Sequence, residues 1–406
     1  MVNVAVMGYG TVGSGVVEVI ETNGKKIDKR AGMHVNIKYV LDLRDFPDDP
    51  IQEKIVHDFE TIVNDQDIKI VVEVMGGVEP AYTFVKQCLR AGKSVVTSNK
   101  ALVAKHGAEL LEIARSNNIN FLFEASVGGG IPIIRPLNSS LTADEIEEIT
   151  GILNGTTNYM LSKMFYEGAE YNTVLKEAQA NGYAEADPTA DVEGYDACRK
   201  IAILSSLVSG QQVDFEDIYT EGITKITAAD MKYAKAMGMT IKLLAVAKRE
   251  AEELQAIVAP FLLGADHPLF NVNDVFNAIF VRGNVLGDAM FYGSGAGKLP
   301  TASAVVADIV DAAKHLHRTI MIDWASEKLK LQDRSQMERR FFVRIKGDSD
   351  GLKAGLNAVF GDVKIVKIAE QDDEFGFITG MMTEGEYGEK VKAYDDIIHM
   401  IRIEGE

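Results

Sequence analysis

The residues between Gly182 and Lys200 carry the strongest chemical signal of this chain. This stretch sets a run of carboxylates ahead of Lys200, at the start of a helix that is apolar on most of its surface. Asp196 and Lys200 are four residues apart, so their side chains lie on one face of that helix. Alone, such a pair is most often a surface ion pair. Further carboxylates arrive from the preceding loop, namely Glu185, Asp187 and Asp191.

Charge of both signs at the edge of an apolar core needs a partner, because burying unpaired charge is costly. A zwitterionic ligand would satisfy it, with its ammonium group at the carboxylates and its reacting oxygen at the lysine. The acidic segment therefore predicts a site for a small amino-acid-like substrate.

A second signal is a glycine-rich turn near the N-terminus. The apolar run from Val2 to Met7 is followed at once by spaced glycines and then by an apolar pattern of helical period. In this order, glycines permit a tight turn and the close approach of a pyrophosphate, which the helix N-terminus attracts. The predicted dinucleotide site comprises Gly8, Gly10, Thr11, Val12 and Gly13.

The end of the second predicted strand, Val35 to Leu41, bears on the choice of cofactor. The acid that follows, Asp42, favours the free 2′-hydroxyl of NAD, whereas Arg44 could hold the 2′-phosphate of NADP. Both residue types are present, so the sequence predicts NAD(P) and leaves the preference open.

Composition limits the classes of partner. The chain has 406 residues, 47% of them hydrophobic and 25% charged, which is typical of a globular protein of two or three domains. Its formal net charge of −18 disfavours nucleic acid and anionic membranes. No apolar run is long enough to span a bilayer, and we expect a cytoplasmic protein. Cys88 and Cys198 are expected to be reduced packing residues.

Strands alternate with amphipathic helices over the first third of the chain. After the two strands above, we expect strands at Ile68–Met75, Val95–Ser98 and Phe121–Glu124, with a helix from Gly107 to Arg115. This alternation predicts an α/β fold with a Rossmann-type, doubly wound parallel sheet. Functional groups gather at the carboxyl ends of such strands, where Gly77, Lys100 and Glu124 fall.

The stretch after Glu124 contains three consecutive glycines, Gly128 to Gly130. It is either a flexible crossing between domains or a loop whose oxygens hold a hard cation. Spacing alone favours the crossing.

Taken together, these motifs resemble the homoserine dehydrogenase family, in its longer bacterial form with a C-terminal regulatory module. The resemblance covers Val2 to about Leu316. It rests on GYGTVG (8–13), TSNKALVAKHG (97–107), EASVGGGIPII (124–134), NGTTNY (154–159), the acidic segment (182–200) and GAGKLPTASAV (295–305).

The resemblance implies reversible NAD(P)H-dependent reduction of L-aspartate 4-semialdehyde to L-homoserine, in threonine, methionine and isoleucine biosynthesis. Lys200 matches the family's proton donor and Lys100 its second active-site lysine. The matching substrate-site residues are Glu185, Asp191, Asp196, Tyr183 and Thr156. Cofactor residues beyond the first turn are Asp42, Arg44, Gly77, Lys100, Gly295 and Gly297.

The resemblance also bears on the glycine loop and on cofactor choice. The loop looks like the family's monovalent cation loop, usually occupied by sodium, through Glu124, Val127, Gly129 and Ile131. Many relatives carry arginine where this chain has Leu41, so strict NADP preference is put in doubt.

The domain organisation follows from where the patterns change. We predict a dinucleotide-binding domain at 1–137 plus 300–323, an inserted α+β substrate-binding, catalytic and dimerisation domain at 138–299, a linker at 324–340 and a C-terminal domain at 341–406. The linker pattern is charged and compatible with a helix. The insertion could dimerise through an open sheet, and we expect a homodimer or homotetramer.

The last 66 residues predict a β-α-β-β-α-β unit of ferredoxin-like type. The unit resembles an ACT-type amino-acid sensor, although Asp350 stands where a proline is usual. Sensing of a threonine effector and a purely structural or oligomerising role stay equally open, because fold analogy does not establish a site.

Two other interpretations share parts of this evidence. A dehydrogenase acting on another small amino acid or aldehyde shares the cofactor motif but leaves the acidic segment unexplained. A non-catalytic, nucleotide-responsive regulator would make the C-terminal unit the working part, and the intact Lys100 and Lys200 argue against it.

Overall fold

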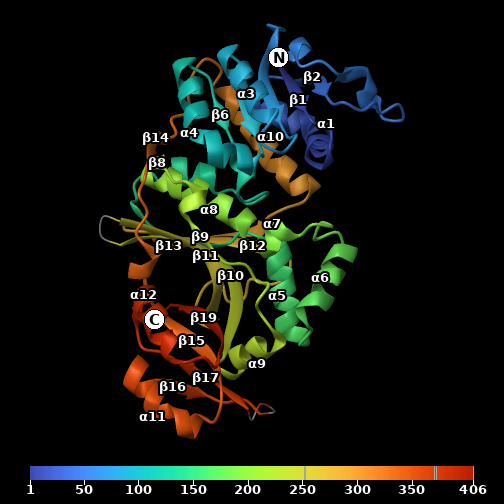
Figure 1. Ribbon diagram of the computed structural model, residues 1–406. Helices are drawn as coiled ribbons and strands as arrows, with labels where there is room; N and C mark the ends of the chain where they lie inside the picture. Colours follow the sequence, from blue (N-terminus) through green and yellow to red (C-terminus); the bar gives the residue numbers. More distant parts are fainter. Residues whose placement is uncertain (251–252, 370, 372, 406) are drawn as a thin grey trace. The chain divides into compact units, whose positions relative to one another are not determined.

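The computed structural model describes residues 1–250, 253–369, 371 and 373–405 (Figure 1). The chain divides into two compact units. The first consists of Met1–Glu145, Ala202–Phe215 and Phe291–Leu329, and the second of Ile146–Ile201, Glu216–Met290 and Lys330–Glu406. The four-part division drawn from the sequence stays a prediction.

The first unit is built on a six-stranded parallel sheet of order β3-β2-β1-β4-β5-β6. Its central strands are apolar and almost entirely buried, as expected of a sheet covered on both faces. The strand order reverses at β1, which creates the switch point where such sheets bind ligands. The strands are β1 (Val2–Met7), β2 (Val35–Leu41), β3 (Ile55–Val56), β4 (Ile68–Glu73), β5 (Ser94–Thr97) and β6 (Phe121–Leu122).

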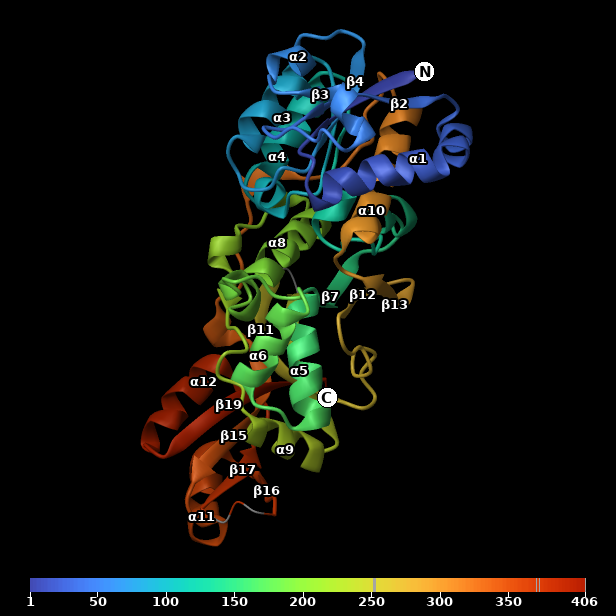
Figure 2. The same cartoon turned by 90° about the vertical axis from the view of Figure 1, so that its right-hand side faces the viewer.

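Helices cover both faces of this sheet, which confirms the predicted Rossmann-type fold. In Figure 2, α1 (Thr11–Ala31) and α10 (Lys298–Lys314) lie on one face, and α2 (Glu60–Val63), α3 (Ala81–Arg90) and α4 (Lys100–Ser116) on the other. Close approach of α1 and α10 requires Gly15, since a Cβ there would lie 2.8 Å from the Lys298 carbonyl oxygen. The unit also contains the pair β8 (Gln211–Gln212) and β14 (Ala325–Lys328).

The predicted start of α4 was wrong. This helix begins at Lys100 and not at Gly107, because the Asn99 side chain caps it by accepting a hydrogen bond from the Leu102 N–H at 3.1 Å. Lys100 is therefore the first residue of a helix at the carboxyl end of β5.

The second unit is built on a mixed sheet whose main path runs β13-β12-β7-β10-β11-β19-β15-β17-β16. Its strands include β7 (Ile146–Ile152), β9 (Tyr219–Thr220), β10 (Met239–Glu250), β11 (Glu253–Gly264), β12 (Phe276–Gly283), β13 (Gly287–Ser294), β15 (Glu338–Lys346), β16 (Lys364–Val366), β17 (Glu374–Ile378), β18 (Met382–Thr383) and β19 (Ile397–Glu404). Its helices are α5 (Gly155–Glu167), α6 (Tyr171–Ala180), α7 (Thr189–Val192), α9 (Ala228–Ala236), α11 (Ser349–Phe360) and α12 (Glu384–Lys390). Helix α8 (Tyr195–Ser209) begins in this unit.

Residues 338–404, which we name the C-terminal module, have the predicted β-α-β-β-α-β order. Their four long strands pair in the order β19-β15-β17-β16 around a core of their own, which is the ferredoxin-like arrangement. Strand β19 also pairs in parallel with β11, with Phe261 opposite Arg402. The sheet of the C-terminal module is thus continuous with that of the inserted residues.

The predicted helix-compatible linker at 324–340 was wrong in its local structure. This stretch holds β14, the 3-10 turn Arg334–Gln336 and the first residues of β15. Its charges made a helix plausible, but tertiary pairing decided the outcome, since Ala325 donates its N–H to the Gly210 carbonyl oxygen.

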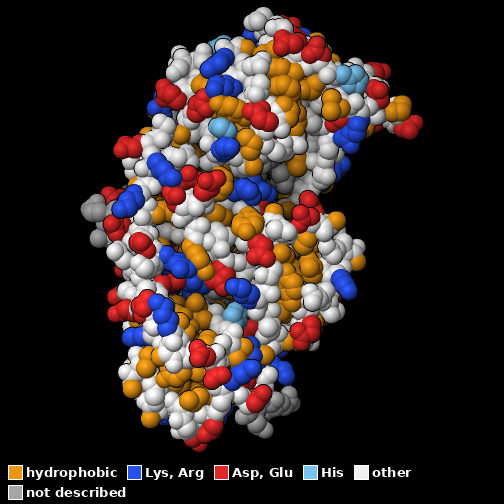
Figure 3. Space-filling view, in the orientation of Figure 1, with side chains coloured by type: hydrophobic (Ala, Val, Ile, Leu, Met, Phe, Trp, Pro, Cys, Tyr) orange, Lys and Arg blue, Asp and Glu red, His pale blue; other side chains and the backbone are white. Residues whose placement is uncertain are grey.

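Acidic and basic side chains are interspersed over the face of the molecule drawn in Figure 3. Within the described part of the chain, the model contains no helix with the length and apolar character needed to cross a bilayer.

Candidate active site

Lys200 and Asp196 meet at the start of α8. The Lys200 Nζ lies 2.7 Å from Asp196 Oδ2 and donates a second hydrogen bond of 2.7 Å to the Leu153 carbonyl oxygen. Both residues are buried, with 8% and 3% of their surface exposed. The predicted pairing on one helix face is therefore present, and burial strengthens the attraction between the two charges while it removes them from water.

Asn154 joins this pair to the carboxylate of Asp191, which lies on the short helix α7 and not in a loop as expected from the sequence. Its Nδ2 donates to Asp191 Oδ1 at 2.7 Å and to Asp196 Oδ2 at 3.0 Å. Its Oδ1 accepts from the Thr157 N–H and so caps α5. The Asn154 side chain thereby bonds two carboxylates and caps a helix, and Lys200 contacts one of these carboxylates, that of Asp196. We call Asn154, Asp191, Asp196 and Lys200 the acidic cluster.

The other predicted substrate residues lie around this cluster in different ways. Thr156 donates its hydroxyl to the Tyr183 carbonyl oxygen at 2.6 Å, while the Tyr183 ring is about half exposed and packs edge-on against Tyr159. Glu185 is exposed, and its backbone carbonyl accepts from Gln179. The structure does not bring the Glu185 carboxylate into a described contact with the cluster.

Asp187 does not converge on the lysine as expected from the sequence. Its carboxylate accepts from the Thr189 N–H at 3.1 Å and from the Thr189 hydroxyl at 2.6 Å. These contacts hold the pKa of Asp187 below its usual value. A short acidic side chain before a helical turn accepts hydrogen bonds from nearby N–H groups more readily than from distant groups. Asp187 therefore stabilises the turn that begins at Thr189.

The glycine turn in the first unit leaves room over its second glycine. Gly8 has φ of 100°, which disfavours any other residue, and a Cβ at Gly13 would lie 1.9 Å from the Gly8 carbonyl oxygen. A Cβ at Gly10 would meet nothing within 4 Å. This combination of a tight turn, close helix packing and open space at the helix N-terminus is what a pyrophosphate needs.

Asp42 and Arg44 at the end of β2 bind each other. The guanidinium of Arg44 reaches the Asp42 carboxylate at 2.9 and 3.0 Å, and the same carboxylate accepts from the Tyr9 N–H at 2.8 Å. The Arg44 contact holds the pKa of Asp42 well below its usual range. Asp42 is thus tied to the glycine turn. Arg44, whose side chain is 62% exposed, also donates to the Tyr9 carbonyl oxygen of that turn at 3.3 Å.

Lys100 and Gly77 are positioned by buried residues that sequence reasoning missed. Glu73 accepts from the Thr97 hydroxyl at 2.6 Å and from the Met75 N–H at 2.8 Å, and burial raises its pKa. Asn99 donates its side-chain N–H to the Gly77 carbonyl oxygen. These contacts fix the carboxyl ends of β4 and β5, and with them the turn that holds Gly77 and the helix that begins at Lys100.

The predicted cation loop, 124–131, packs against the glycine-rich segment 293–297 that precedes α10. A Cβ at Gly129 would lie 2.2 Å from the Gly295 carbonyl oxygen, and the Gly130 N–H donates to the Ser294 carbonyl oxygen at 3.1 Å. Gly297 has φ of 119° and precedes α10. The two predicted glycine segments are therefore in backbone contact.

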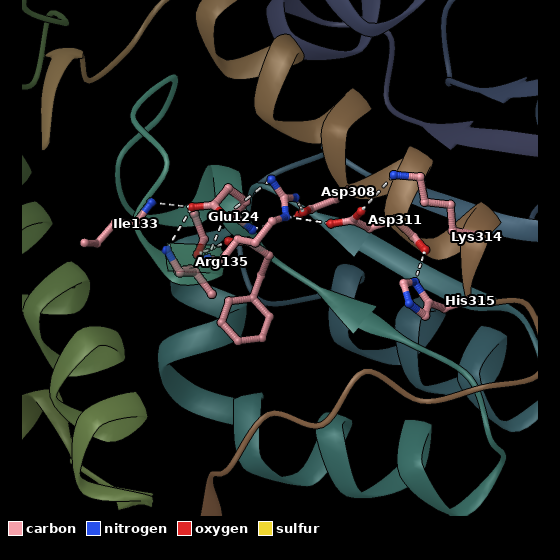
Figure 4. A network of polar contacts seen from close by, with 10 residues as sticks. Glu124, Ile133, Arg135, Asp308, Asp311, Lys314 and His315 are labelled. Atoms are coloured by element: carbon pink, nitrogen blue, oxygen red, sulfur yellow. Dashed lines mark hydrogen bonds and ion pairs between the residues drawn. The ribbon is translucent and has the colours of Figure 1, made fainter. Parts of the chain in front are cut away.

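Glu124 is held by the backbone of the residues that follow the loop (Figure 4). Its carboxylate accepts from the N–H groups of Ile133, Ile134 and Arg135 at 2.6 to 2.8 Å, and its own N–H donates to Asp308 Oδ2 at 2.8 Å. The short 3-10 turn Glu124–Ser126 presents this residue.

Arg135 joins Glu124 to the aspartates of α10. In Figure 4 its guanidinium lies between Glu124 and the pair Asp308 and Asp311, with Nε 2.6 Å from Asp311 Oδ2. Burial and the nearby Glu124 raise the pKa of Asp308 to about 8. The Glu124 carboxylate thus accepts three backbone N–H groups, and the Arg135 Nη1 lies 4.0 Å from its Oε2.

Two of these residues could have been found from the sequence. Asn154 precedes a helical pattern, which is the usual place for a capping residue, but nothing local indicates that its amide also reaches Asp191, 37 residues away. Glu73 lies inside the predicted strand Ile68–Met75, where an acid in an apolar run is a signal for a buried, bonded carboxylate. Both cysteines are buried, as expected of packing residues.

Comparison with known proteins agrees with this arrangement. The pattern of the family described as "Homoserine dehydrogenase, NAD binding domain" matches residues 8–124, and that described as "Homoserine dehydrogenase" matches residues 132–310. A homoserine dehydrogenase of Mycobacterium tuberculosis is 41% identical over an alignment that covers 100% of this chain and 98% of the relative. The chain belongs to the homoserine dehydrogenase family.

Solved structures of homoserine dehydrogenases extend the match to three dimensions. That from Thiobacillus denitrificans has a TM-score of 0.92 at 36% identity, over 99% of this chain and 98% of the other. A hyperthermophilic archaeal homoserine dehydrogenase in complex with NADPH has a TM-score of 0.63 at 29% identity, over 77% of this chain and 97% of the other.

Membership of the homoserine dehydrogenase family fixes the reaction class. The chain is an NAD(P)-dependent oxidoreductase that interconverts L-aspartate 4-semialdehyde and L-homoserine. The resemblance inferred from the motifs is confirmed, and with it the predicted enzyme class.

Proposed function

We propose that Lys200 supplies the proton for reduction of L-aspartate 4-semialdehyde. When bound, the nicotinamide cofactor supplies the hydride to the aldehyde carbon, which leaves negative charge on the oxygen. Lys200 then transfers a proton from Nζ to that oxygen and forms the hydroxyl group of L-homoserine. The observation that carries this role is the contact of Nζ with Asp196 at 2.7 Å, because a carboxylate in contact favours the charged, proton-carrying lysine.

The carboxylates of the acidic cluster bind the ammonium group of the substrate. Asn154 gathers Asp191 and Asp196, so negative charge is concentrated at one point. Thr156 follows Asn154 by two residues and donates its hydroxyl to the Tyr183 carbonyl oxygen, which supports a place for both residues beside the cluster. Glu185 remains in the proposal as a loop carboxylate, and Lys100 as a second cation for the substrate carboxylate.

The glycine turn and its neighbours hold the cofactor. The proposed contacts are with Gly8, Gly10, Thr11, Val12, Gly13, Asp42, Arg44, Gly77, Lys100, Gly295 and Gly297. Space over Gly10 supports a pyrophosphate there. Asp42 and Arg44 support use of both NAD and NADP, since the first suits a ribose hydroxyl and the second a phosphate.

A monovalent cation, expected to be sodium, fits the loop at 124–131 through backbone carbonyls. The proposed ligands are Glu124, Val127, Gly129 and Ile131. The carbonyl oxygens of Val127, Gly129 and Ile131 accept none of the backbone hydrogen bonds found in the described loops, which supports this use. The proposed ligands are mainly backbone carbonyls, and among the described residues no group of three or more His, Cys, Asp or Glu side chains could hold a metal ion.

The remaining expectations are carried forward as proposals. They are a homodimer or homotetramer, a cytoplasmic biosynthetic role, and threonine binding by the C-terminal module. The ferredoxin-like strand order supports the last of these only at the level of fold.

The proposed substrate site is tested by exchanging its carboxylates. Purified wild type should reduce NAD or NADP with L-homoserine, followed by nicotinamide absorbance. Asp191→Asn should raise the KM for homoserine by about tenfold or more while the KM for the cofactor stays within about twofold, because one carboxylate facing the ammonium group is lost.

The matched control is Asp187→Asn, four residues before Asp191. Asp187 touches only Thr189 in its described hydrogen bonds, so the variant should have the wild-type KM for homoserine. Equal KM changes in the two variants would contradict the assignment of the ammonium site. Absence of turnover by wild type with both cofactors would overturn the function itself.

A further inference from the structure

Arg402 of the C-terminal module is buried between two carboxylates of different origin. Only 2% of its side chain is exposed. Its Nε and Nη2 bind Glu384 of the same module at 2.6 and 3.0 Å, while its Nη1 donates to Glu221 Oε2 at 2.7 Å. Glu221 lies outside the module, so this contact is a charged tie between the module and the inserted residues.

Glu221 belongs to a short segment, Tyr219–Ile223, which we name the bracket. Strand β9, the first part of the bracket, pairs in parallel with β11, and the Glu221 N–H donates to the Val258 carbonyl oxygen at 2.8 Å. The Tyr219 hydroxyl donates to Glu221 Oε2 at 3.1 Å, and the Arg402 guanidinium lies 5.2 Å from the Tyr219 ring centre. Arg402 therefore holds the bracket by a salt bridge and by a ring contact.

The other side of the bracket touches the backbone that carries the acidic cluster. A Cβ at Gly222 would lie 2.1 Å from the Val192 carbonyl oxygen and 2.4 Å from Glu193 Cα, and the Ile223 N–H donates to the Val192 carbonyl oxygen at 2.8 Å. Val192 follows Asp191 directly. The bracket is thus packed backbone to backbone against residues 192–193.

The start of α8 is fixed by the same segment. A Cβ at Gly194 would lie 3.1 Å from Thr220 Cγ2 and 3.6 Å from the Glu221 carbonyl oxygen. The Gly194 N–H donates to the Asp191 carbonyl oxygen at 3.0 Å, which closes the turn between Asp191 and Asp196. The bracket consequently contacts the turn that sets the spacing of the two carboxylates.

We propose that Arg402 and Glu221 are positioning residues that set the geometry of the substrate carboxylates through the bracket. The inference rests on the proposed role of Asp191 and Asp196. The C-terminal module thereby acts on substrate affinity within a single chain, by a continuous series of contacts from β19 to the acidic cluster. Small displacements of binding groups are costly, so loosening the bracket should weaken homoserine binding.

Arg344 provides a matched comparison in the same module. It is also buried, and it also joins a carboxylate of the module, Glu374, to one outside it, Asp230, at 2.8 Å each. Asp230 lies in the capping box at the start of α9 and not in the bracket. The two arginines therefore differ in what they hold, while their burial and charge partners are alike.

The test uses the full chain and the variants Arg402→Lys, Glu221→Gln and Arg344→Lys. Lysine keeps the positive charge but lacks the planar guanidinium, whose several N–H groups bind two carboxylates at once. Arg402→Lys and Glu221→Gln should raise the KM for homoserine about fivefold, with kcat and the KM for cofactor within about twofold. Arg344→Lys should lower the Tm as much as Arg402→Lys does and leave the KM for homoserine within twofold.

Amide exchange gives a second reading that a general loss of stability would not reproduce. In Glu221→Gln the Ile223 and Gly194 N–H groups should exchange faster than in wild type, and in Arg344→Lys they should not. Glu221→Gln keeps the side-chain shape, so it answers the question even where Arg402→Lys fails to fold.

Unchanged KM for homoserine in Arg402→Lys and Glu221→Gln, while Asp191→Asn raises it, would overturn the positioning role and leave the proposed function intact. An equal rise in Arg344→Lys would also overturn it, because the effect would then be general. If Asp191→Asn itself leaves the KM unchanged, the proposed substrate site fails instead.

Discussion

Two buried lysines, Lys200 and Lys242, bind residues just before and within the first turn of α5, and they have opposite surroundings. Lys200 contacts a carboxylate, Asp196, and the Leu153 carbonyl oxygen just before the helix. Lys242 on β10 donates only to neutral oxygens in its described hydrogen bonds, those of Val272, Asn158 and Asn273. Asn158 is in the first turn of α5 and Leu153 lies two residues before that helix, so the two lysines bind neighbouring stretches of the chain.

The difference teaches what a carboxylate does for a buried lysine. Burial without a carboxylate in contact lowers the pKa of Lys242 to about 7. By bonding these three oxygens, Lys242 links α5 to the residues near 272, which is a structural role. Lys200 has the counter-charge that a proton donor needs, beside carboxylates that suit an amino-acid substrate.

The largest expected effect is the loss of kcat when Lys200 is replaced. Lys200→Ala should lower kcat about a thousandfold, because the developing oxyanion loses its proton donor, while the affinity for cofactor stays within about twofold. Steady-state kinetics and cofactor titration measure both. Lys163→Ala, a surface lysine of α5 paired with Glu167, is the control and should retain wild-type kcat. Equal losses of kcat and cofactor affinity in Lys200→Ala would count against its role.

The second effect concerns stability and pH. Lys242 binds its proton with a pKa of about 7 in the folded chain and near 10.5 when unfolded, so the unfolded chain holds more protons between these values. Stability must then rise with pH over that range. The free energy of unfolding of wild type, relative to Lys242→Met, should increase by about 2 kcal/mol from pH 7 to pH 9. Urea denaturation at both pH values measures this, and a constant difference would show that Lys242 does not titrate there.

A third variant makes Lys200 resemble Lys242. Asp196→Asn removes the carboxylate in contact, so the lysine should lose its proton at lower pH. The alkaline limit of reductive turnover should move down by about one pH unit. Glu193→Gln, in the same stretch, should leave the profile where it is. A pH profile that does not move in Asp196→Asn would mean that Asp196 acts only on substrate binding.

The smallest effect tests the comparison of Asp42, which is half-buried, with Arg44, which is exposed. Arg44→Ala should raise the KM for NADP about fivefold and leave that for NAD within about twofold, because only NADP carries the 2′-phosphate. Lys38→Ala, on β2 and paired with Asp65, is the control. A rise in both KM values would show that Arg44 acts by fixing Asp42.

Sequence reasoning succeeded where a pattern is local. The bounds of β2 match those expected from the alternation of apolar residues, and Asp196 and Lys200 meet because helical spacing alone brings them together. The glycine turn was recognised by its order of strand, turn and helix.

It failed where a contact joins distant elements. Asn154 reaches Asp191 and Asp196 from another helix, and no local feature of the sequence encodes that reach. Lys242 lies on β10, but its partners come from α5 and from residues near 272. The pairing of β11 with β19, which joins the C-terminal module to the inserted residues, is equally non-local.

The central claim is that the Lys200 amine carries the transferred proton, and chemical rescue tests it most directly. Added methylammonium should restore part of the lost kcat of Lys200→Ala, in proportion to its concentration, and should leave wild type unchanged. A Lys200→Ala variant that folds, binds cofactor and turns over at the wild-type rate without added amine would contradict the account.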